Sequence, residues 1–323
     1  MTVSADFSEP PLPNADLSGD ASQQSTAFFL LVTGTPPFSP AMADWLGVTR
    51  YNIDYDGAPT TMKPGLEKNQ VADPCGLVFR AKSAELFVGN RHGNNAGDGV
   101  AGSVSRFKYN ASDQSFTANG VITGNNLNGV CQMTFSPTTG ELFASNSDGN
   151  GGVSRFTFDS GDNAVANGTI LDTVSTRGVM IAPDGKRIYV TDALTSIYQY
   201  DLMNSMQLSS VTMPDPSAAV HFEAIWGNTL YVAALGVNKI YRYTVSSTDD
   251  LVFKDSISST SPISIAFSPD GLEMFAASHD NAQVIDRFSY NSSMDTWTAT
   301  TSITAPSSMG MIWMFPVAAV PIN

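Results

Sequence analysis

A short hydrophobic segment recurs six times along the chain, and each copy ends in small or polar residues. The copies read FLLVTG, ELFVGN, ELFASN, RIYVTD, TLYVAA and EMFAAS, at residues 29–34, 85–90, 141–146, 187–192, 229–234 and 273–278. Successive copies begin between 42 and 56 residues apart, which brackets the length of about 40 to 50 residues that a four-stranded propeller blade occupies. The recurrence predicts a repeat architecture in which each copy supplies one strand.

The residues around each copy predict the other strands of a blade. An apolar run precedes each complete copy, at 75–79, 131–135, 177–181, 222–226 and 263–267, as expected of an inner strand buried on both faces. Turn sequences such as APDGK (182–186) and SPDGL (268–272) join the two strands. A third strand follows with alternating aromatic residues, as at Phe107 and Tyr109, and then a more polar fourth strand, as at 115–123.

The chain is therefore expected to be all-β, as a β-propeller of six four-stranded blades, with seven blades as the alternative. The first copy has no apolar run before it, whereas residues 308–315 form an apolar run without a copy after it. The C-terminal strand is expected to pair with the N-terminal blade, which would close the ring and cover its edges. We expect an extended arm over residues 1–25 and one propeller domain over residues 26–323.

The charge of the chain excludes several classes of partner. The chain has 16 basic and 30 acidic residues, a formal net charge of −14, and no run of basic residues. Such a field repels the phosphates of nucleic acids and anionic membrane surfaces. No apolar stretch is long enough to cross a bilayer, and the N-terminus lacks the basic and apolar regions of a signal peptide. We expect a soluble protein, cytoplasmic or part of an assembled particle, that neither binds nucleic acid nor inserts into membranes.

One copy resembles a known repeat. The segment APDGKRIYVTD (182–192) resembles the YVTN-type repeat of lactonase-like propellers. Six-bladed gluconolactonase and paraoxonase-like hydrolases hold calcium in the central channel, and Asp192 fits an acidic position of their pattern. Arg177 stands where that pattern has Asn, and the equivalent column is mostly apolar: Cys75, Cys131, Arg177, Phe222, Ile263 and Met309. Because a hard cation needs six to eight oxygen ligands, the sequence predicts that this calcium site is absent.

The resemblance implies one of two candidate functions, a lactonase-like hydrolase acting at the central channel. Its catalytic candidates are His221, Glu223 and Asp192. His221 and Glu223 are two residues apart on a predicted strand, so their side chains share a face and could form an acid–base pair. The alternative is an ordinary polar pair at the start of a strand, which we favour from the sequence.

Three long polar loops, at 33–47, 90–103 and 146–152, are expected on one rim of the propeller. Solvated connectors are one interpretation, and a patch that binds a protein or glycan partner is the other. The candidate binding residues are Trp45, Arg91, His92, Asn94, Asn95, Asp98, Asp148 and Asn150.

Three smaller motifs have simple structural explanations. Asn146, Asp148 and Asn150 match the start of a calcium-binding loop, but the bidentate Glu at its twelfth position is absent, and a polar turn explains the motif. Four arginines directly precede third-strand aromatics: Arg50, Arg106, Arg155 and Arg287. A structural role is expected, such as pairing with loop carboxylates or stacking, with a ring of ligand-binding arginines as the less favoured alternative. Cys75 and Cys131 occupy equivalent places in adjacent blades, so buried thiols are expected, with a disulfide as the less favoured alternative.

The N-terminal arm, residues 1–25, is rich in proline and acidic residues and should be disordered alone. It could be ordered by its own propeller or by docking on another subunit. Together with the long loops, the arm favours a non-enzymatic binding or structural propeller, such as a subunit of a virion or surface structure. The lactonase-like hydrolase is the alternative function.

Overall fold

The computed structural model describes residues 28–34, 47–53, 61–66, 70–71, 73–91, 102–149, 151–171, 175–192, 194–246, 250–268, 270–279, 284–304 and 320–321. These parts of the chain consist of antiparallel strands, with two short 3-10 helices, η2 (Ala81–Ser83) and η3 (Leu235–Val237). Within these ranges no helix has the length and apolarity needed to cross a membrane.

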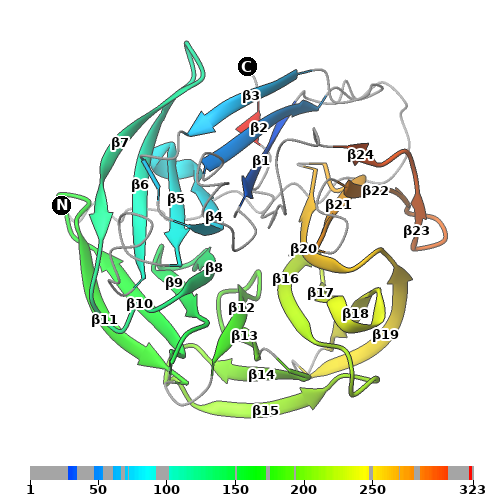
Figure 1. The fold of residues 1–323 in the computed structure, drawn as a ribbon. Helices are drawn as coiled ribbons and strands as arrows, with labels where there is room; N and C mark the ends of the chain where they lie inside the picture. The colour runs from blue at the N-terminus through cyan, green and yellow to red at the C-terminus, as the bar shows by residue number, and fades with distance from the viewer. Residues whose placement is uncertain are drawn as a thin grey trace, which may run out of the picture.

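The strands form antiparallel sheets arranged around a common centre, as expected of a β-propeller (Figure 1). One sheet is β4 (Pro74–Arg80), β5 (Glu85–Asn90), β6 (Ser103–Asn110) and β7 (Ser115–Ile122). The next is β8 (Val130–Phe135), β9 (Leu142–Asn146), β10 (Val153–Phe158) and β11 (Ala164–Ile170). The third is β12 (Thr176–Ile181), β13 (Arg187–Asp192), β14 (Ser196–Asp201) and β15 (Gln207–Thr212).

Two further sheets follow in chain order, and another joins the two ends of the chain. The first is β16 (Val220–Trp226), β17 (Thr229–Ala234), β18 (Lys239–Val245) and β19 (Leu251–Ser258). The second is β20 (Pro262–Phe267), β21 (Glu273–Ser278), β22 (Val284–Asn291) and β23 (Thr296–Ala299), with β24 (Ile303–Thr304) also on β22. The joining sheet is β25 (Val320–Pro321), β1 (Phe28–Gly34), β2 (Gly47–Ile53) and β3 (Thr61–Leu66).

The predicted strand order of a blade is confirmed. The recurring segment is the second strand of each sheet, and the apolar run before it is the first, nearest the centre (Figure 1). The C-terminal end pairs with the N-terminal blade as predicted, because Val320 lies opposite Phe29. Residues 308–315, which were expected to make this pairing, lie outside the described residues, as does the arm over residues 1–25.

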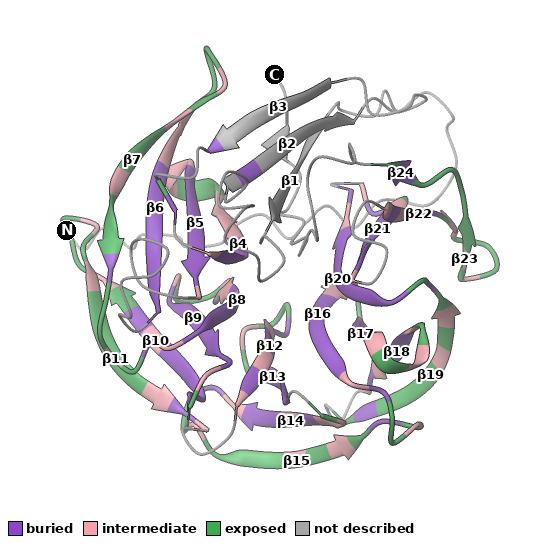
Figure 2. Cartoon of the chain, viewed as in Figure 1, coloured by how far each residue is buried: buried purple, intermediate pink, exposed green. Residues whose placement is uncertain are grey.

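Burial decreases from the centre of the propeller outward (Figure 2). All five residues of β9 are buried, whereas β7 and β11 are mostly exposed. The inner strand β8 packs against the inner strands β4 and β12 of the neighbouring sheets. The apolar inner runs are therefore covered on both faces, as the sequence pattern predicts.

The turn between the first and second strands requires a left-handed residue. Gly140, Gly185 and Gly271 adopt φ angles of 67°, 71° and 68° at this position. Ala84 takes the same place after η2, with φ 46°. The conformation suits glycine, which has no Cβ to clash, and explains the recurring Pro-Asp-Gly signature.

The repeated arginines tie strands together and link each blade to the next. Arg106 forms a two-pronged ion pair with Glu85, with both N–O distances 3.0 Å, and the Arg106 guanidinium also binds Asp162 at 2.8 Å. Arg155 binds Glu141 in the same way and reaches Ser205 at 3.0 Å. The predicted structural role of these arginines is confirmed for Arg106, Arg155 and Arg287, whose partner is Glu273; the Arg50 side chain is outside the described residues.

The inter-blade partners share one position, the hairpin between the third and fourth strands of the following sheet. Asp162, Ser205 and Asp295 lie there with φ angles of 61°, 55° and 51°. Asp295 accepts from Arg242, a fourth arginine of this kind, which pairs with Asp255 within its own sheet. Thr229 occupies the position in the sheet of Arg242 that Glu85, Glu141 and Glu273 occupy in theirs. The carboxylate partner of Arg242 within its sheet is therefore Asp255, on the outer strand β19.

We expect Arg106→Met to lower the free energy of unfolding by about 3–5 kcal/mol, because the fully buried Glu85 would lose its two-pronged partner and keep only the more distant Lys108, at 3.6 Å. Guanidinium chloride unfolding of the full chain measures this loss. Lys186→Met, at an exposed lysine, is the control and should change stability by less than about 0.5 kcal/mol. Adding Glu85→Gln to Arg106→Met should restore part of the loss. Equal stability of the Arg106→Met and Lys186→Met variants would contradict this role.

Candidate functional site

Each of the five described inner strands carries an irregularity near its start. The pairing of the first two strands shifts register between Pro74 and Leu77, Val130 and Met133, Thr176 and Gly178, Val220 and Glu223, and Pro262 and Ser264. A bulge of this kind re-aims the side chain it contains. The bulged positions include the column expected from the sequence, namely Cys75, Cys131, Arg177, Phe222 and Ile263; Met309 lies outside the described residues.

Side chains of the neighbouring strands satisfy the main-chain groups that these bulges leave without ladder partners. The Ser145 hydroxyl accepts from the N–H of Gln132 and donates to the carbonyl of Arg177, at 2.8 Å each. The Thr191 hydroxyl accepts from Gly178 N–H at 2.8 Å and donates to the His221 carbonyl at 2.7 Å. Each of these two hydroxyls therefore binds the main chain at the bulge of its own blade and at the bulge of the next blade.

The Gln132 side chain joins three inner strands. Its amide oxygen accepts from the N–H groups of Val179, at 3.0 Å, and Glu223, at 3.3 Å. Its amide nitrogen donates to the Glu223 carbonyl at 2.6 Å. Gln132 belongs to β8, Val179 to β12 and Glu223 to β16, so this amide holds three blades in register beside the bulges.

One part of the bulge ring is apolar. Cys75, Cys131, Phe222 and Ile263 are almost fully buried and belong to one continuous core cluster, although they come from four blades. These side chains offer no oxygen ligands, and within the described ranges no group of three His, Cys, Asp or Glu residues could hold a metal ion. The donor set here does not fit the channel calcium of six-bladed gluconolactonases.

The other part of the ring carries basic residues, and we call the group of Arg91, Arg177, His221 and His279 the channel mouth. Arg177 Nη1 lies 3.8 Å from the Sγ of Cys131. Arg91, which follows β5, pairs with Asp148, which follows β9, at 3.6 Å. Arg177, His279 and Arg91 lie near enough to His221 to lower its pKa. Two long loops and the inner strands therefore contribute to the channel mouth.

Electrostatics at the channel mouth keep an imidazole neutral and favour a thiolate. Burial lowers the pKa of His221 to about 3, and the nearby side chains of Arg177 and His279 act in the same direction. A hydrogen bond from Cys75 lowers the pKa of Cys131 to about 6 against the effect of burial, and Arg177 contributes to the lowering. Near neutral pH the site therefore combines guanidinium groups, a neutral imidazole and a thiolate.

Glu223 is a fully buried carboxyl beside the channel mouth. Among the described residues no hydrogen bond of good geometry reaches its carboxylate oxygens, and only the main chain of Met180 lies close enough to favour the ionised form. Burial raises the pKa of Glu223 to about 8, so the group is protonated at neutral pH. No hydrogen bond joins it to His221, and the shift of neither pKa is caused by the other residue. The acid–base pair considered from the sequence is not formed in this structure.

Asp192 serves the turn after β13. Its Oδ1 accepts from the N–H groups of Leu194, at 2.9 Å, and Ser196, at 3.0 Å. The residue that fits the acidic position of the hydrolase pattern therefore caps a loop in this structure.

Two of the eight predicted binding residues are described, Arg91 and Asp148, and they face each other across two blades. The other six lie outside the described residues: Trp45, His92, Asn94, Asn95, Asp98 and Asn150. Within the resembled calcium loop, the Asn146 amide nitrogen donates to Gly151, Gly152 and Ser154, and its amide oxygen accepts from Asn128. Asn146 thus closes the loop as a structural tie.

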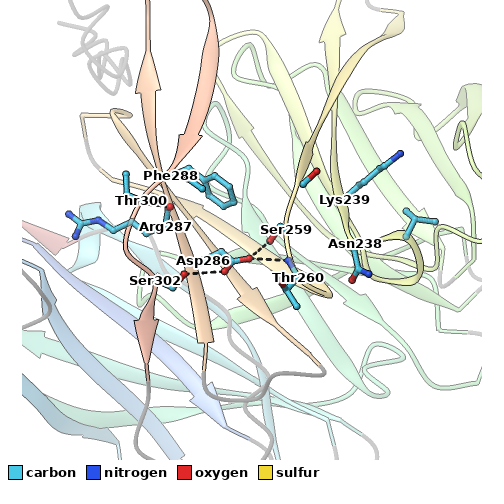
Figure 3. Close-up of a pocket in the computed structure, with 12 residues that line it drawn as sticks. Asn238, Lys239, Ser259, Thr260, Asp286, Arg287, Phe288, Thr300 and Ser302 are labelled. Carbon is cyan, nitrogen blue, oxygen red and sulfur yellow. Dashed lines mark hydrogen bonds between the residues drawn. The ribbon is translucent and has the colours of Figure 1, made fainter.

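A separate groove of about 540 Å³ lies between the sheet of β16–β19 and the sheet of β20–β23 (Figure 3). Asp286 lies in it and accepts from Ser259 Oγ at 2.8 Å, Thr260 N at 3.0 Å and Ser302 Oγ at 3.3 Å. A carboxylate with three internal donors holds two sheets together, and this contact gives the groove a structural role.

The pH dependence of stability should report the state of Glu223. Its folded pKa of about 8 exceeds the unfolded value of about 4.5, so the folded state keeps a proton that the unfolded state releases. Stability from this group is complete below about pH 4.5 and is lost as the pH rises toward 8, by at most about 1.4 kcal/mol per pH unit.

Glu223→Gln should remove that loss. The difference in free energy of unfolding between wild type and variant, measured at about pH 5 and about pH 8, should therefore grow in favour of the variant. Asp184→Asn, at an exposed carboxylate, is the control. A difference that does not vary with pH would show that the Glu223 carboxyl is not protonated in the fold.

Comparison with known proteins identifies the family. The family described as "Lactonase, 7-bladed beta-propeller" matches residues 47–313. No curated protein matches the chain significantly.

Solved structures share the fold at low sequence identity. A putative 6-phosphogluconolactonase from Bacteroides uniformis ATCC 8492 is 13% identical, with a TM-score of 0.62 over 87% of this chain and 84% of that one. The periplasmic gluconolactonase of Pseudomonas aeruginosa is 14% identical, with a TM-score of 0.58 over 93% and 99%. A chain of a nidogen/laminin complex is 11% identical, with a TM-score of 0.62 over 91% and 98%. At these identities the likeness establishes the fold alone.

The sequence-based prediction of a non-enzymatic binding or structural module is wrong, because the family match favours the lactonase-like alternative. The physical reason lies in Arg91 and Asp148. The sequence suggested that their loops present a surface to a partner, but these two residues face each other at the channel mouth. The chain belongs to the lactonase family of seven-bladed β-propellers.

Proposed function

We propose that the protein is a hydrolase that opens the ring of a sugar-type lactone at the channel mouth. The observation that carries this proposal is the lactonase family match over residues 47–313. Two similar structures are described as a putative 6-phosphogluconolactonase and a periplasmic gluconolactonase. Both names refer to hydrolysis of a cyclic sugar ester, which sets the class of substrate to try first.

Lactone hydrolysis makes two demands that the channel mouth can meet. Attack of water on the ring carbonyl places negative charge on the carbonyl oxygen, and ring opening yields a carboxylate. Arg177 and Arg91 provide fixed positive charge for both. Burial opposes the charge of Arg91, but Cys131, Cys75 and Asp148 outweigh burial and raise the pKa of Arg91. The Arg91 guanidinium therefore keeps its charge throughout the working pH range.

The attacking water must lose a proton. His221 is our candidate acceptor in the channel mouth, because burial keeps its imidazole neutral and able to accept a proton. Its low pKa makes it a weak base, which suits an activated ester such as a strained lactone better than an amide. In this proposal Arg177 and Arg91 stabilise the oxyanion, and His221 orients the water and takes its proton.

The number of blades is part of the same proposal. The described strands form six sheets, one of which joins β25 to β1, whereas the family description has seven blades. We infer a ring of six blades in this chain. The recurring segments are spaced 42 to 56 residues apart and belong to five complete repeats and to one blade that the two ends of the chain form together.

Purified protein should accelerate the opening of glucono-1,5-lactone or its 6-phosphate above the spontaneous rate, followed by acid release in weakly buffered indicator. Arg177→Met should lower kcat/KM by about 100- to 1000-fold, as loss of one oxyanion donor does. Lys186→Met, which removes an exposed positive charge, should keep wild-type activity. Circular dichroism should establish that both variants are folded.

Two results would contradict this proposal. The first is a panel of sugar lactones, phosphorylated and not, that opens no faster with enzyme than without it. The second is turnover that Arg177→Met leaves unchanged, which would move the reaction away from the channel mouth. An effect on KM alone would assign Arg177 to binding of the substrate and not to the oxyanion.

A further inference from the structure

The two cysteines of the chain lie side by side at the centre of the propeller. Cys75 Sγ and Cys131 Sγ are 3.5 Å apart, within a thiol–thiol hydrogen bond. Both side chains are almost fully buried, and both are reduced in this structure. Buried thiols, the interpretation favoured from the sequence, are therefore present, and the two thiols lie in contact.

The close approach has a local cause. Cys75 and Cys131 both lie within bulges of neighbouring inner strands, β4 and β8. Gly76 follows Cys75, and a Cβ on Gly76 would lie 2.1 Å from the carbonyl oxygen of Cys131. A residue without a side chain at position 76 thus lets the two backbones approach, and the bulges turn the two sulfur atoms toward each other.

The two thiols are chemically unequal. Cys131 is contacted by Arg177 Nη1 at 3.8 Å, and Arg91 contributes a second positive charge. Burial and the neighbouring Cys131 raise the pKa of Cys75 well above its usual value, whereas the pKa of Cys131 falls to about 6. Cys131 is the nucleophile of the pair, and Cys75 remains a thiol that can resolve an oxidised neighbour.

Cys131 is fully buried, but two of its neighbours are partly exposed: Arg177, which contacts it, and Gln132, which follows it in the chain. The reaction proposed below therefore requires an oxidant that is small and uncharged, because a large disulfide reagent cannot reach a fully buried sulfur.

We propose that Cys75 and Cys131 form a redox-active dithiol, a modification site at the channel mouth that hydrogen peroxide converts to a disulfide. The inference stands apart from lactone hydrolysis, because it depends on the two sulfur atoms and not on the substrate.

The reaction balances in two steps. The Cys131 thiolate attacks one peroxide oxygen, the O–O bond breaks, and the departing hydroxide takes a proton to become water, which leaves Cys131 as a sulfenic acid. The Cys75 sulfur then attacks the Cys131 sulfur, the S–O bond breaks, and the hydroxyl leaves with the Cys75 proton as a second water. Two thiols are oxidised by two electrons, and one peroxide is reduced to two waters.

The geometry requires little movement. A disulfide has an S–S distance of about 2.0 Å, so the sulfur atoms must close by about 1.5 Å from their 3.5 Å separation. Side-chain rotation can supply this change while β4 and β8 stay paired within their own sheets. The product links two blades and removes the Cys131 thiolate from Arg177.

The test uses the full chain, reduced and then exposed to hydrogen peroxide. The intact mass should fall by two hydrogen atoms, a peptide containing Cys75 should be found linked to one containing Cys131, and dithiothreitol should restore both thiols. The rate should not depend on protein concentration. Oxidation of Cys131 to sulfinic acid without a link, or two unreactive thiols in the folded protein, would overturn the proposal.

Variants separate the roles of the two cysteines. Cys75→Ser should stop at the Cys131 sulfenic acid, which dimedone traps, and Cys131→Ser should leave Cys75 unreactive. Arg177→Met should slow oxidation by about tenfold or more at neutral pH, because less of Cys131 is then thiolate. Lys186→Met should react at the wild-type rate. Wild-type speed in the Arg177→Met variant, or dimedone labelling of Cys75 in Cys131→Ser, would overturn the assigned order. If a serine variant does not fold, alanine replaces serine.

Discussion

The side-chain amide of Gln132 joins three inner strands at the centre of the propeller, and the positions of the other central residues depend on this contact. It accepts from β12 and exchanges hydrogen bonds with β16 from its own place on β8. A buried main-chain group without a partner is costly, and bulges create such groups at the start of each inner strand. Gln132, Ser145 and Thr191 satisfy them with side chains that reach the next blade. The bulges can therefore persist, and they aim Cys131 and Arg177 at the channel mouth.

The arginines of the chain serve two different purposes. Arg106, Arg155 and Arg242 lie toward the outside of the sheets, each with a carboxylate in its own sheet and a partner on the next hairpin. These contacts link neighbouring blades, and the carboxylates neutralise the positive charge of the three arginines. Arg177 and Arg91 lie at the channel mouth with a thiol and one carboxylate nearby. Asp148 and the Cys131 thiolate lie beside them, so these two arginines belong to the site and not to the links between blades.

The strands could be predicted because the recurring segments and the apolar runs before them follow directly from burial on both faces. The segments at 187–192, 229–234 and 273–278 coincide with β13, β17 and β21.

The site could be predicted only in part. Arg177 was noticed as a departure from a calcium pattern, but its contact with Cys131 depends on bulges that leave no signal in hydrophobic periodicity. Gln132 carried no signal beyond one polar residue in an apolar run. Glu85, Glu141 and Glu273 are visible as the acidic first residue of three of the six segments, yet their arginine partners lie on another strand. The long loops gave a wrong function because length and polarity do not reveal which way Arg91 and Asp148 face.

The most direct measurement of the central claim is a crystal structure of the protein with gluconate, the ring-opened product, at high concentration. The account predicts electron density at the channel mouth, with the carboxylate within hydrogen-bond distance of Arg177 or Arg91 and a hydroxyl beside His221. Density in the groove around Asp286 instead, with the channel mouth filled only by water, would contradict the assignment of the chemistry to the bulged ends of the inner strands.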